Sequence, residues 1–273
     1  MILDYKNIKL NLEFFSDFKP KNKSILFLHG FTGSSSDWQE IIQKINPRFN
    51  TIALDLIGHG KSSSPADIKF YKSNEIVNQL LFVTEYLKIE KVILCGYSMG
   101  GRAALCFAIT HPGKISALIL ESTSAGIEYE EERKVRIKND EQLADFIESN
   151  SIEEFVNSWL EMDLFGSLKK FPREKLEDYK RTKLKNSKTG LANSLRGFGT
   201  GVMPYLGNEI KKLNSAVLLI TGKLDTKFTI INSRLVQQFN YAEHQIIEDA
   251  GHNVHVENPS KCISAVNEFL MKF

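Results

Sequence analysis

Short, continuously apolar runs recur along this chain, and they constrain its fold more than any other feature. Such runs, several of them rich in β-branched residues, are typical of strands buried on both faces of a mostly parallel sheet. Helical patterns separate most of them, so the alternation predicts a doubly wound α/β fold. The apolar runs are 24–30, 51–58, 91–98, 115–122, 216–222 and 244–249, and the helical patterns lie near 36–46, 74–88, 99–110, 229–239 and 259–271.

One long interval interrupts this alternation. Between Ser122 and Ala216 the sequence offers no strand, and its polar composition predicts three or four amphipathic helices. Adjacent strands of one sheet do not need so long a connection. We therefore interpret residues 124–199 as a helical cap inserted into an α/β core that consists of residues 1–123 and 200–273.

The two halves of this interval differ in charge. Residues 128–163 contain 12 acidic and 4 basic residues, whereas residues 169–196 contain 3 acidic and 10 basic residues. Charges of this kind fit the solvated faces of helices. The alternative interpretation is that the basic half lies over an anionic ligand.

Composition excludes several classes of function. A net charge of +2 gives no general argument for binding nucleic acid or an anionic membrane. No apolar run approaches the ~18 residues that span a bilayer, and the alternating start (1–15) predicts a strand and not a signal peptide. The three cysteines lack a CxxC pattern, which favours buried free thiols. We expect a cytoplasmic protein, a monomer or weak dimer, with no nucleic-acid or membrane partner.

The stretch GYSMGG, residues 96–101, supplies a candidate nucleophile. It matches G-x-S-x-G between an apolar strand and an apolar helix, where the serine sits on a tight, strained turn. A side chain at Gly96 or Gly100 would collide with neighbouring backbone. The turn would present Ser98 at the carboxyl edge of the sheet, where α/β folds place their ligands.

A serine hydroxyl needs a base, and the base needs an orienting carboxylate. Asp225 follows the strand 216–222, and His252 follows the strand 244–249, in the chain order expected for this fold. Because all three residues come after parallel strands, they should meet at one edge of the sheet. The sequence predicts a triad of Ser98, Asp225 and His252, the alternative being a polar loop aspartate and a surface histidine.

Developing negative charge would also need preorganised N–H donors. Met99 follows the nucleophile at a helix N-terminus, and Phe31 lies in the loop after strand 24–30, so we expect their N–H groups to form an oxyanion hole. We interpret His29 and His59 as loop-shaping residues, and His255 as a helix-turn residue or a pocket wall. No cluster has metal-ligand spacing, and we expect neither a metal nor a cofactor.

The motifs LHGFTGSSSDW, DLIGHGKS, GYSMGGR, GKLDTKF and AGHNVHVENP, taken in order, resemble the α/β-hydrolase superfamily over nearly the whole chain. Within it, three features resemble the family of 2-succinyl-6-hydroxy-2,4-cyclohexadiene-1-carboxylate (SHCHC) synthases of menaquinone biosynthesis. They are Arg102, which closes the nucleophile motif, the pair Lys227 and Phe228, and the stretch GHNVHVENP.

The resemblance implies a pocket for a substrate with three carboxylates. It implies binding roles for Arg136, Trp159 and, after a one-residue shift of the alignment, Arg181. Independently of it, Arg102 lies about one helical turn after Ser98, where a guanidinium suits bidentate capture of a carboxylate. A structural ion pair in the cavity wall is the alternative role for Arg102. We also expect Lys227 at the mouth of this pocket and Tyr97 in its lining.

The resemblance further implies a cofactor-free carbon–carbon lyase that eliminates pyruvate from a succinyl-enolpyruvyl cyclohexene carboxylate. The expected mechanism is proton abstraction by Ser98, with His252 and Asp225 activating it. Two alternatives stay open. The same triad would serve a serine hydrolase, such as a carboxylesterase, a thioesterase or a carbon–carbon bond hydrolase, acting through an acyl-enzyme. A non-enzymatic receptor or scaffold is the second, although an intact triad argues against it.

Overall fold

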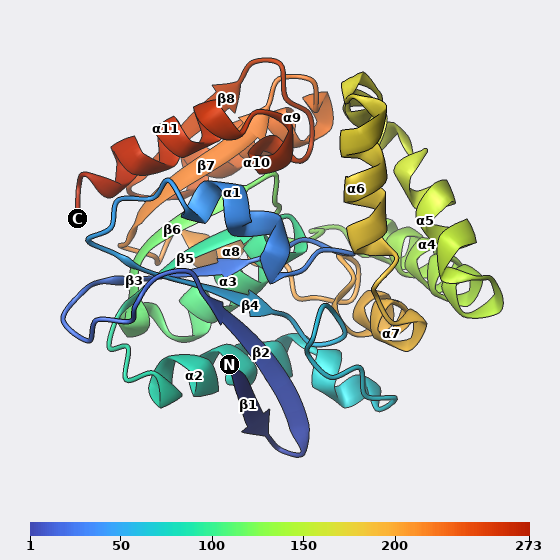
Figure 1. Cartoon of the computed structure of the whole chain (residues 1–273), viewed down its shortest axis with the longest axis horizontal. Helices are drawn as coiled ribbons and strands as arrows, with labels where there is room; N and C mark the ends of the chain where they lie inside the picture. The colour runs from blue at the N-terminus through green and yellow to red at the C-terminus, as the bar shows by residue number, and fades with distance from the viewer.

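One eight-stranded sheet, in the order β1-β2-β4-β3-β5-β6-β7-β8, carries the fold (Figure 1). The computed structural model describes residues 1–273. Strands β3 to β8 pair in parallel, while β1 with β2 and β2 with β4 are antiparallel. The strands are β1 Ile2–Tyr5, β2 Ile8–Phe14, β3 Ser24–Leu28, β4 Asn50–Asp55, β5 Val92–Tyr97, β6 Ile115–Glu121, β7 Ala216–Gly222 and β8 Ala242–Ile247. The predicted α/β fold with a mostly parallel sheet is confirmed.

The predicted first strand, 1–15, consists of two strands. β1 and β2 form a hairpin whose two turn residues, Lys6 and Asn7, have φ angles of 45° and 68°. A two-residue hairpin turn of this type needs positive φ at both positions. Asn-Gly and Asp-Gly are the sequences that usually indicate such a turn. Lys-Asn carries no such signal, so alternation alone gave one continuous strand.

Helices cover both faces of the sheet. The α-helices are α1 Gln39–Ile42, α2 Ser73–Tyr86, α3 Met99–Thr110, α4 Glu130–Ser149, α5 Ile152–Leu160, α6 Arg173–Lys183, α7 Lys188–Phe198, α8 Gly207–Ile210, α9 Thr226–Leu235, α10 Val254–Glu257 and α11 Pro259–Leu270. Short 3-10 helices are η1 Ser35–Trp38, η2 Ile68–Tyr71, η3 Pro112–Lys114, η4 Asp163–Lys170 and η5 Val236–Gln238. The helix predicted at 36–46 is therefore a 3-10 turn followed by one turn of α-helix.

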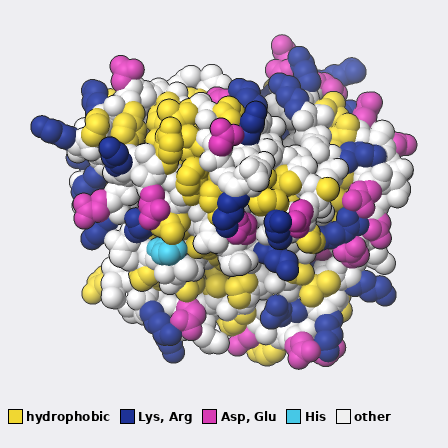
Figure 2. Space-filling model, turned by 90° about the horizontal axis from the view of Figure 1, so that it is seen from below, with side chains coloured by type: hydrophobic (Ala, Val, Ile, Leu, Met, Phe, Trp, Pro, Cys, Tyr) yellow, Lys and Arg dark blue, Asp and Glu magenta, His cyan; other side chains and the backbone are white.

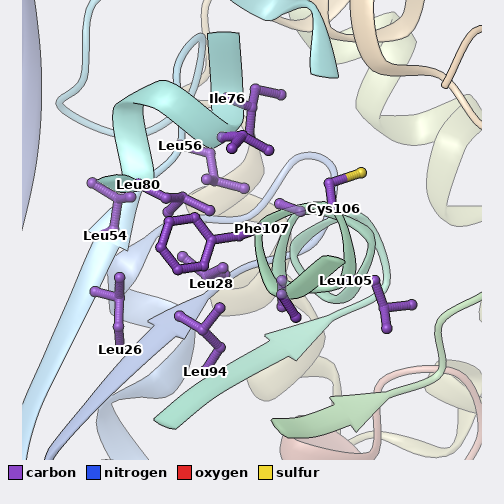
Figure 3. Packing of buried hydrophobic residues seen from close by; sticks show 14 of the residues in the cluster. Leu26, Leu28, Leu54, Leu56, Ile76, Leu80, Leu94, Leu105, Cys106 and Phe107 are labelled. Atoms are coloured by element: carbon purple, nitrogen blue, oxygen red, sulfur yellow. The ribbon is translucent and has the colours of Figure 1, made fainter. Parts of the chain in front are cut away.

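Strand β3 shows why its sequence is continuously apolar. Leu26 and Leu28 point into the core on the side of α2 and α3, whereas Ile25 and Phe27 point into the core on the side of α1 and α11. Successive side chains of a strand face opposite sides, so a strand covered on both sides must be apolar at every position. Figure 3 shows the first of these cores, in which Phe107 of α3 packs among leucines of β3, β4 and β5.

The interval between β6 and β7 contains α4 to α8, of which α4 to α7 stand beside the sheet (Figure 1). Helices α4, α5 and α7 share a small apolar cluster of their own, which includes Ala144, Ile147, Phe155 and Leu191. We keep the division into a core and a cap of residues 124–199 as an interpretation of this arrangement. Because these helices bury apolar side chains against one another, they need no strand of the sheet within this segment to pack on.

The distribution of charged side chains on the surface agrees with the small net charge of the chain. Across the face shown in Figure 2, basic and acidic side chains are interspersed with hydrophobic ones, without a continuous field of one sign. Cys95, Cys106 and Cys262 are buried free thiols, as predicted. None of the helices combines the length and the apolar character needed to cross a bilayer.

Candidate active site

Ser98 lies on a strained turn between β5 and α3, with φ 50° and ψ −106°. Residues other than glycine seldom adopt this region, and such strain collects at functional sites. The flanking glycines make the turn possible. A Cβ on Gly96 would lie 2.5 Å from the backbone of Gly100, and one on Gly100 would lie 2.1 Å from the carbonyl oxygen of Leu28. The turn therefore raises Ser98 at the carboxyl edge of the sheet.

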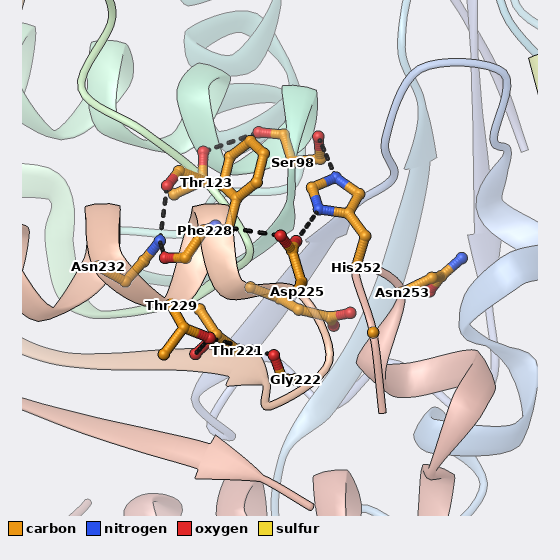
Figure 4. A network of polar contacts seen from close by, with 12 residues as sticks. Ser98, Thr123, Thr221, Gly222, Asp225, Phe228, Thr229, Asn232, His252 and Asn253 are labelled. Carbon is orange, nitrogen blue, oxygen red and sulfur yellow. Dashed lines mark hydrogen bonds and ion pairs between the residues drawn. The ribbon is translucent and has the colours of Figure 1, made fainter. Parts of the chain in front are cut away.

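Ser98, His252 and Asp225 meet at this edge (Figure 4). Nε2 of His252 lies 3.2 Å from Oγ of Ser98, and Nδ1 of the same ring lies 2.6 Å from Oδ2 of Asp225. With a carboxylate at Nδ1, that nitrogen carries the proton and donates it, which leaves Nε2 free to accept from the serine hydroxyl. The three side chains thus have the distances and the order of a nucleophile, a base and an orienting acid.

Asp225 is itself held in place. Its Oδ1 accepts a hydrogen bond of 3.1 Å from the backbone N–H of Phe228, so the side chain caps the N-terminus of α9. Figure 4 also shows a chain from the same helix back to the nucleophile. Asn232 donates to the carbonyl of Thr123, whose hydroxyl donates to the carbonyl of Ser98 at 2.8 Å. Helix α9 therefore positions both the acid and the turn that carries the nucleophile.

A cavity of about 1300 Å³ opens beside the triad, between the sheet edge and helices α4, α5 and α7. Ser98, His252 and Asp225 line it together with Phe31 and Met99. The backbone N–H of Phe31 donates to no other group of the protein. Met99 is the first residue of α3, where the N–H has no carbonyl one turn earlier to bind. Both predicted donors are thus beside the nucleophile, with the α3 N-terminus favouring negative charge there.

Arg102 lies in the cavity wall one turn after Ser98, with 9% of its surface exposed. No carboxylate pairs with it. Its Nη1 donates to the carbonyl of Phe198 at 2.7 Å, and the guanidinium lies over the Phe198 ring. Burial, reinforced by the charge of nearby Arg136, lowers the pKa of Arg102 to about 10, so the group stays charged at neutral pH. The carboxylate of Asp140, which pairs with Arg136, also attracts the guanidinium, but no carboxylate forms an ion pair with Arg102. The alternative of a structural ion pair is therefore wrong.

The other predicted basic groups divide into two sets. Arg136 and Lys227 line the cavity, and Nε of Arg136 pairs with Oδ1 of Asp140 at 2.8 Å. Arg181 does not line the cavity: its side chain is 70% exposed and pairs with Asp178 on the outer side of α6. Sequence reasoning missed Lys170, which also lines the cavity but lies in a segment without a recognisable motif.

Aromatic rings complete the wall. Trp159 packs edge-on against Phe31 with 5.2 Å between ring centroids, which links the predicted cap to the predicted oxyanion loop. The ring of Tyr97 lies 5.3 Å from that of His252, and both residues line the cavity. Tyr97 and Trp159 therefore both lie in the wall of this cavity. No group of three or more His, Cys, Asp or Glu side chains is arranged to hold a metal ion.

His255 does not line the cavity. It lies in α10, is fully buried, pairs through Nδ1 with Glu121 at 2.9 Å, and stacks on Trp38 with centroids 4.2 Å apart. The ring of His255 also packs edge-on against that of Tyr97. The pair of His255 with Glu121 was not predicted, because in the sequence Glu121 is simply the last residue of a strand. It supports the site from behind without contacting the cavity.

Comparison with known proteins agrees with this geometry. The family model described as "alpha/beta hydrolase fold" matches residues 23–259, and the chain belongs to that family. A Bacillus subtilis (strain 168) protein with the name "Putative 2-succinyl-6-hydroxy-2,4-cyclohexadiene-1-carboxylate synthase" is 40% identical over 91% of this chain and 90% of its own length. Within the α/β-hydrolase family, this chain is thus similar to SHCHC synthases.

Solved structures give the same grouping. The structure of MenH from S. aureus has a TM-score of 0.91 and 32% identity, covering 96% of this chain and 98% of that one. A thermophilic esterase from Thermogutta terrifontis has a TM-score of 0.86 at 22% identity, covering 97% and 94% of the two chains, and shares the fold. The chain is a MenH-like α/β hydrolase.

Proposed function

We propose that this protein is an SHCHC synthase of menaquinone biosynthesis. It would eliminate pyruvate from 2-succinyl-5-enolpyruvyl-6-hydroxy-3-cyclohexene-1-carboxylate. The observation that carries the proposal is the position of the buried Arg102 cation beside the assembled triad, in one cavity with Arg136 and Lys227. A desolvated cation without an anionic partner is costly unless a ligand supplies the anion. The substrate has three carboxylates to offer.

The chemistry follows from the two ends of the triad. His252, oriented by Asp225, accepts the proton of Ser98, and the serine oxygen takes a proton from the ring carbon that bears the succinyl group. The electron pair forms a new ring double bond, the existing double bond shifts, and the bond from the ring to the enolpyruvyl oxygen breaks. Pyruvate leaves as its enolate and then gains a proton on carbon.

This electron count corrects the reaction class expected from the sequence. The enolpyruvyl group is attached to the ring through oxygen, so the bond that breaks is carbon–oxygen and the activity is that of a carbon–oxygen lyase, not a carbon–carbon lyase. The charge that develops spreads onto the succinyl carbonyl. The N–H groups of Phe31 and Met99 would stabilise it there, and Arg102, Arg136 and Lys227 would hold carboxylates. Tyr97 and Trp159 would line the ring, and no cofactor is required.

Incubation with the succinyl-enolpyruvyl substrate, with pyruvate as the readout, tests the proposal. The wild-type protein should release pyruvate, and Ser98→Ala should lose at least about 10³-fold in kcat. Ser264→Ala on the exposed face of α11 is the matched control and should keep full activity. Near wild-type pyruvate release by Ser98→Ala would disprove the mechanism.

Two other outcomes identify the alternatives. Rapid turnover of short acyl esters with an acyl-Ser98 intermediate, and no pyruvate release, would make the protein a serine hydrolase. No turnover of either substrate class, together with an unreactive Ser98, would indicate a binding protein. A small-molecule substrate and a cytoplasmic location are part of the same proposal.

A further inference from the structure

Lys183, at the C-terminal end of α6, is a buried cation that the proposed mechanism does not use. Its side chain is 2% exposed, its Nζ donates to Oδ2 of Asp37 at 2.8 Å, and Nζ lies 4.4 Å from the centroid of the Tyr179 ring. Lysine is almost never fully buried unless it is paired. Burial works to lower the pKa of Lys183, but the attraction of Asp37 and Tyr179 outweighs it and raises that pKa, so the cation persists.

Asp37 ties this cation to the loop after β3 that carries Phe31. The same Oδ2 that binds Lys183 accepts from the backbone N–H of Ser34 at 3.4 Å. The carboxylate also packs against Gly33, where a Cβ would lie 2.6 Å from Oδ2. The end of α6 is therefore fixed to residues 33–37, which begin two residues after Phe31.

A second tie holds the residue next to Phe31. Nδ2 of Asn186, which lies just beyond the end of α6, donates to the carbonyl of Thr32 at 2.8 Å and to the carbonyl of Lys183 at 3.0 Å. Thr32 has φ 65°, a conformation that residues with a Cβ rarely adopt and that costs about 1–3 kcal/mol. Such strain persists only where the surroundings enforce it. Asn186 does not line the cavity, and its side-chain hydrogen bonds join only the end of α6 to the loop. Its bond to Thr32 therefore acts on the backbone next to the Phe31 N–H.

The same helix also reaches the loop of the catalytic base. The hydroxyl of Tyr179, one turn before Lys183, accepts a hydrogen bond of 3.0 Å from Nδ2 of Asn253. Asn253 directly follows His252 and is buried. Helix α6 stands at the inner side of the helices between β6 and β7, facing the core (Figure 1). Helix α6 thus contacts both the loop that carries Phe31 and the loop that carries His252.

We propose that Lys183 and Asn186 are positioning residues that hold the oxyanion loop, through Asp37 and the Thr32 carbonyl, so that the Phe31 N–H points at the reacting oxygen. This inference rests on the proposed oxyanion role of Phe31. It gives the buried ion pair of Lys183 and Asp37 a function in catalysis. Two apolar side chains often stabilise a fold as well as a buried ion pair does, so stability alone does not explain the charges here.

The test uses two readouts on purified full-length protein. Lys183→Met removes the charge but keeps the length of the side chain. The double variant Asp37→Asn with Lys183→Met also removes the carboxylate that would otherwise be left buried without a partner. In both variants, and in Asn186→Ala, we expect kcat for pyruvate release to fall about 10- to 100-fold while KM holds, because a misplaced donor affects the transition state alone. The rate at which a fluorophosphonate labels Ser98 should fall by a similar factor.

Lys180→Met is the matched control. Lys180 lies on the same helix, is 23% exposed, pairs with Glu153 at 3.9 Å and does not line the cavity. This variant should keep both rates. If the double variant and Asn186→Ala fold with wild-type thermal stability and keep wild-type kcat and labelling rate, the positioning role is refuted and the ion pair is only structural. If Lys183→Met does not fold, the double variant and Asn186→Ala decide.

The labelling rate separates this inference from the proposed function. Phosphonylation of Ser98 by the fluorophosphonate, with loss of fluoride, builds negative charge at the same N–H groups but needs no cyclohexene substrate. Slower labelling of the three variants in a protein that releases no pyruvate would refute the SHCHC synthase proposal and support the positioning role. Normal labelling with wild-type pyruvate release would do the reverse.

Discussion

Nδ1 of His252 lies 2.6 Å from Oδ2 of Asp225, and both side chains are buried at the wall of the cavity. The other oxygen of this carboxylate accepts from the backbone of α9, so the acid cannot turn away from the ring. The pair therefore fixes which nitrogen of His252 carries the proton, and leaves the other to act on Ser98 at 3.2 Å.

Asp225→Asn should lower kcat for pyruvate release by about 10²- to 10⁴-fold, because an amide can donate to Nδ1 and favour the wrong tautomer. Binding of the product should change little, since Asp225 offers the substrate no positive charge. Steady-state kinetics and calorimetric titration of the product measure the two effects. Asp249→Asn, an exposed aspartate three residues before His252, is the control and should behave as wild type. A small loss of kcat in Asp225→Asn would contradict the triad.

Arg102→Met should weaken binding of the tricarboxylate product by about 10- to 100-fold, since a hydrogen-bonded charge contributes on the order of 1.5–3 kcal/mol. Methionine fills most of the buried volume, so the fold should persist. Labelling of Ser98 by a neutral fluorophosphonate should stay within about 3-fold of wild type, a change below about 1 kcal/mol. Arg181→Met, outside the cavity, is the matched control. Unchanged product affinity in Arg102→Met would refute the carboxylate-binding role.

The meeting of Ser98, Asp225 and His252 at one edge of the sheet could be predicted from sequence because it depends on strand ends. Ser98, Asp225 and His252 each follow a parallel strand, and parallel strands of one sheet end at the same edge whatever the loops do. The glycines around Ser98 added a second, local signal, since Gly96 and Gly100 are required by close backbone contacts that the motif itself implies. Periodicity and a motif therefore sufficed for the fold and for the order of the three residues.

The inner side of α6 could not be predicted in the same way. A shift of one residue turns a side chain by about 100° around a helix axis. Alignment placed Arg181 at the pocket, whereas the structure exposes Arg181 and buries Lys183, two residues later. The hydrogen-bond partner of Arg102 could not be predicted either. It is the backbone carbonyl of Phe198, 96 residues away in the chain, and every residue has such a carbonyl.

Gly190→Ala should destabilise the protein by about 1–3 kcal/mol, the usual cost of overpacking. Gly190 lies in α7, and a Cβ there would lie 2.1 Å from the carbonyl oxygen of Gly58, in the loop after β4. Gly113→Ala is the matched control, because a Cβ at Gly113 meets nothing within 4 Å. Urea denaturation gives the free energy of unfolding of each variant. Equal values for Gly190→Ala and Gly113→Ala would show that α7 does not lie this close to the core.

His59 packs directly behind the oxyanion loop. Its ring is buried, lies 5.9 Å from that of Phe31 and 5.0 Å from that of His29, and its Nδ1 is 3.1 Å from the carbonyl of Ile57. Burial, together with repulsion from His29, lowers the pKa of His59 from 6.5 to about 3. Asp55 opposes this shift and Lys183 adds to it, so the ring is neutral in the folded protein at every pH above about 3.

A depressed pKa of this kind makes the folded state lose stability in acid. Between pH 6.5 and about 3 the unfolded chain binds a proton at His59 that the folded protein does not. The contribution of the neutral His59 to the free energy of unfolding is fully present above pH 6.5. It declines as pH falls, by up to about 1.4 kcal/mol per pH unit.

His59→Asn keeps a donor for the Ile57 carbonyl but cannot titrate. Its deficit in unfolding free energy relative to wild type should therefore shrink by up to about 2 kcal/mol between pH ~6.5 and pH ~5, measured by urea denaturation. Ser62→Ala, a buried change in the same loop without a titrating group, should show a deficit that does not vary with pH. A constant deficit in His59→Asn as well would contradict a neutral, buried His59.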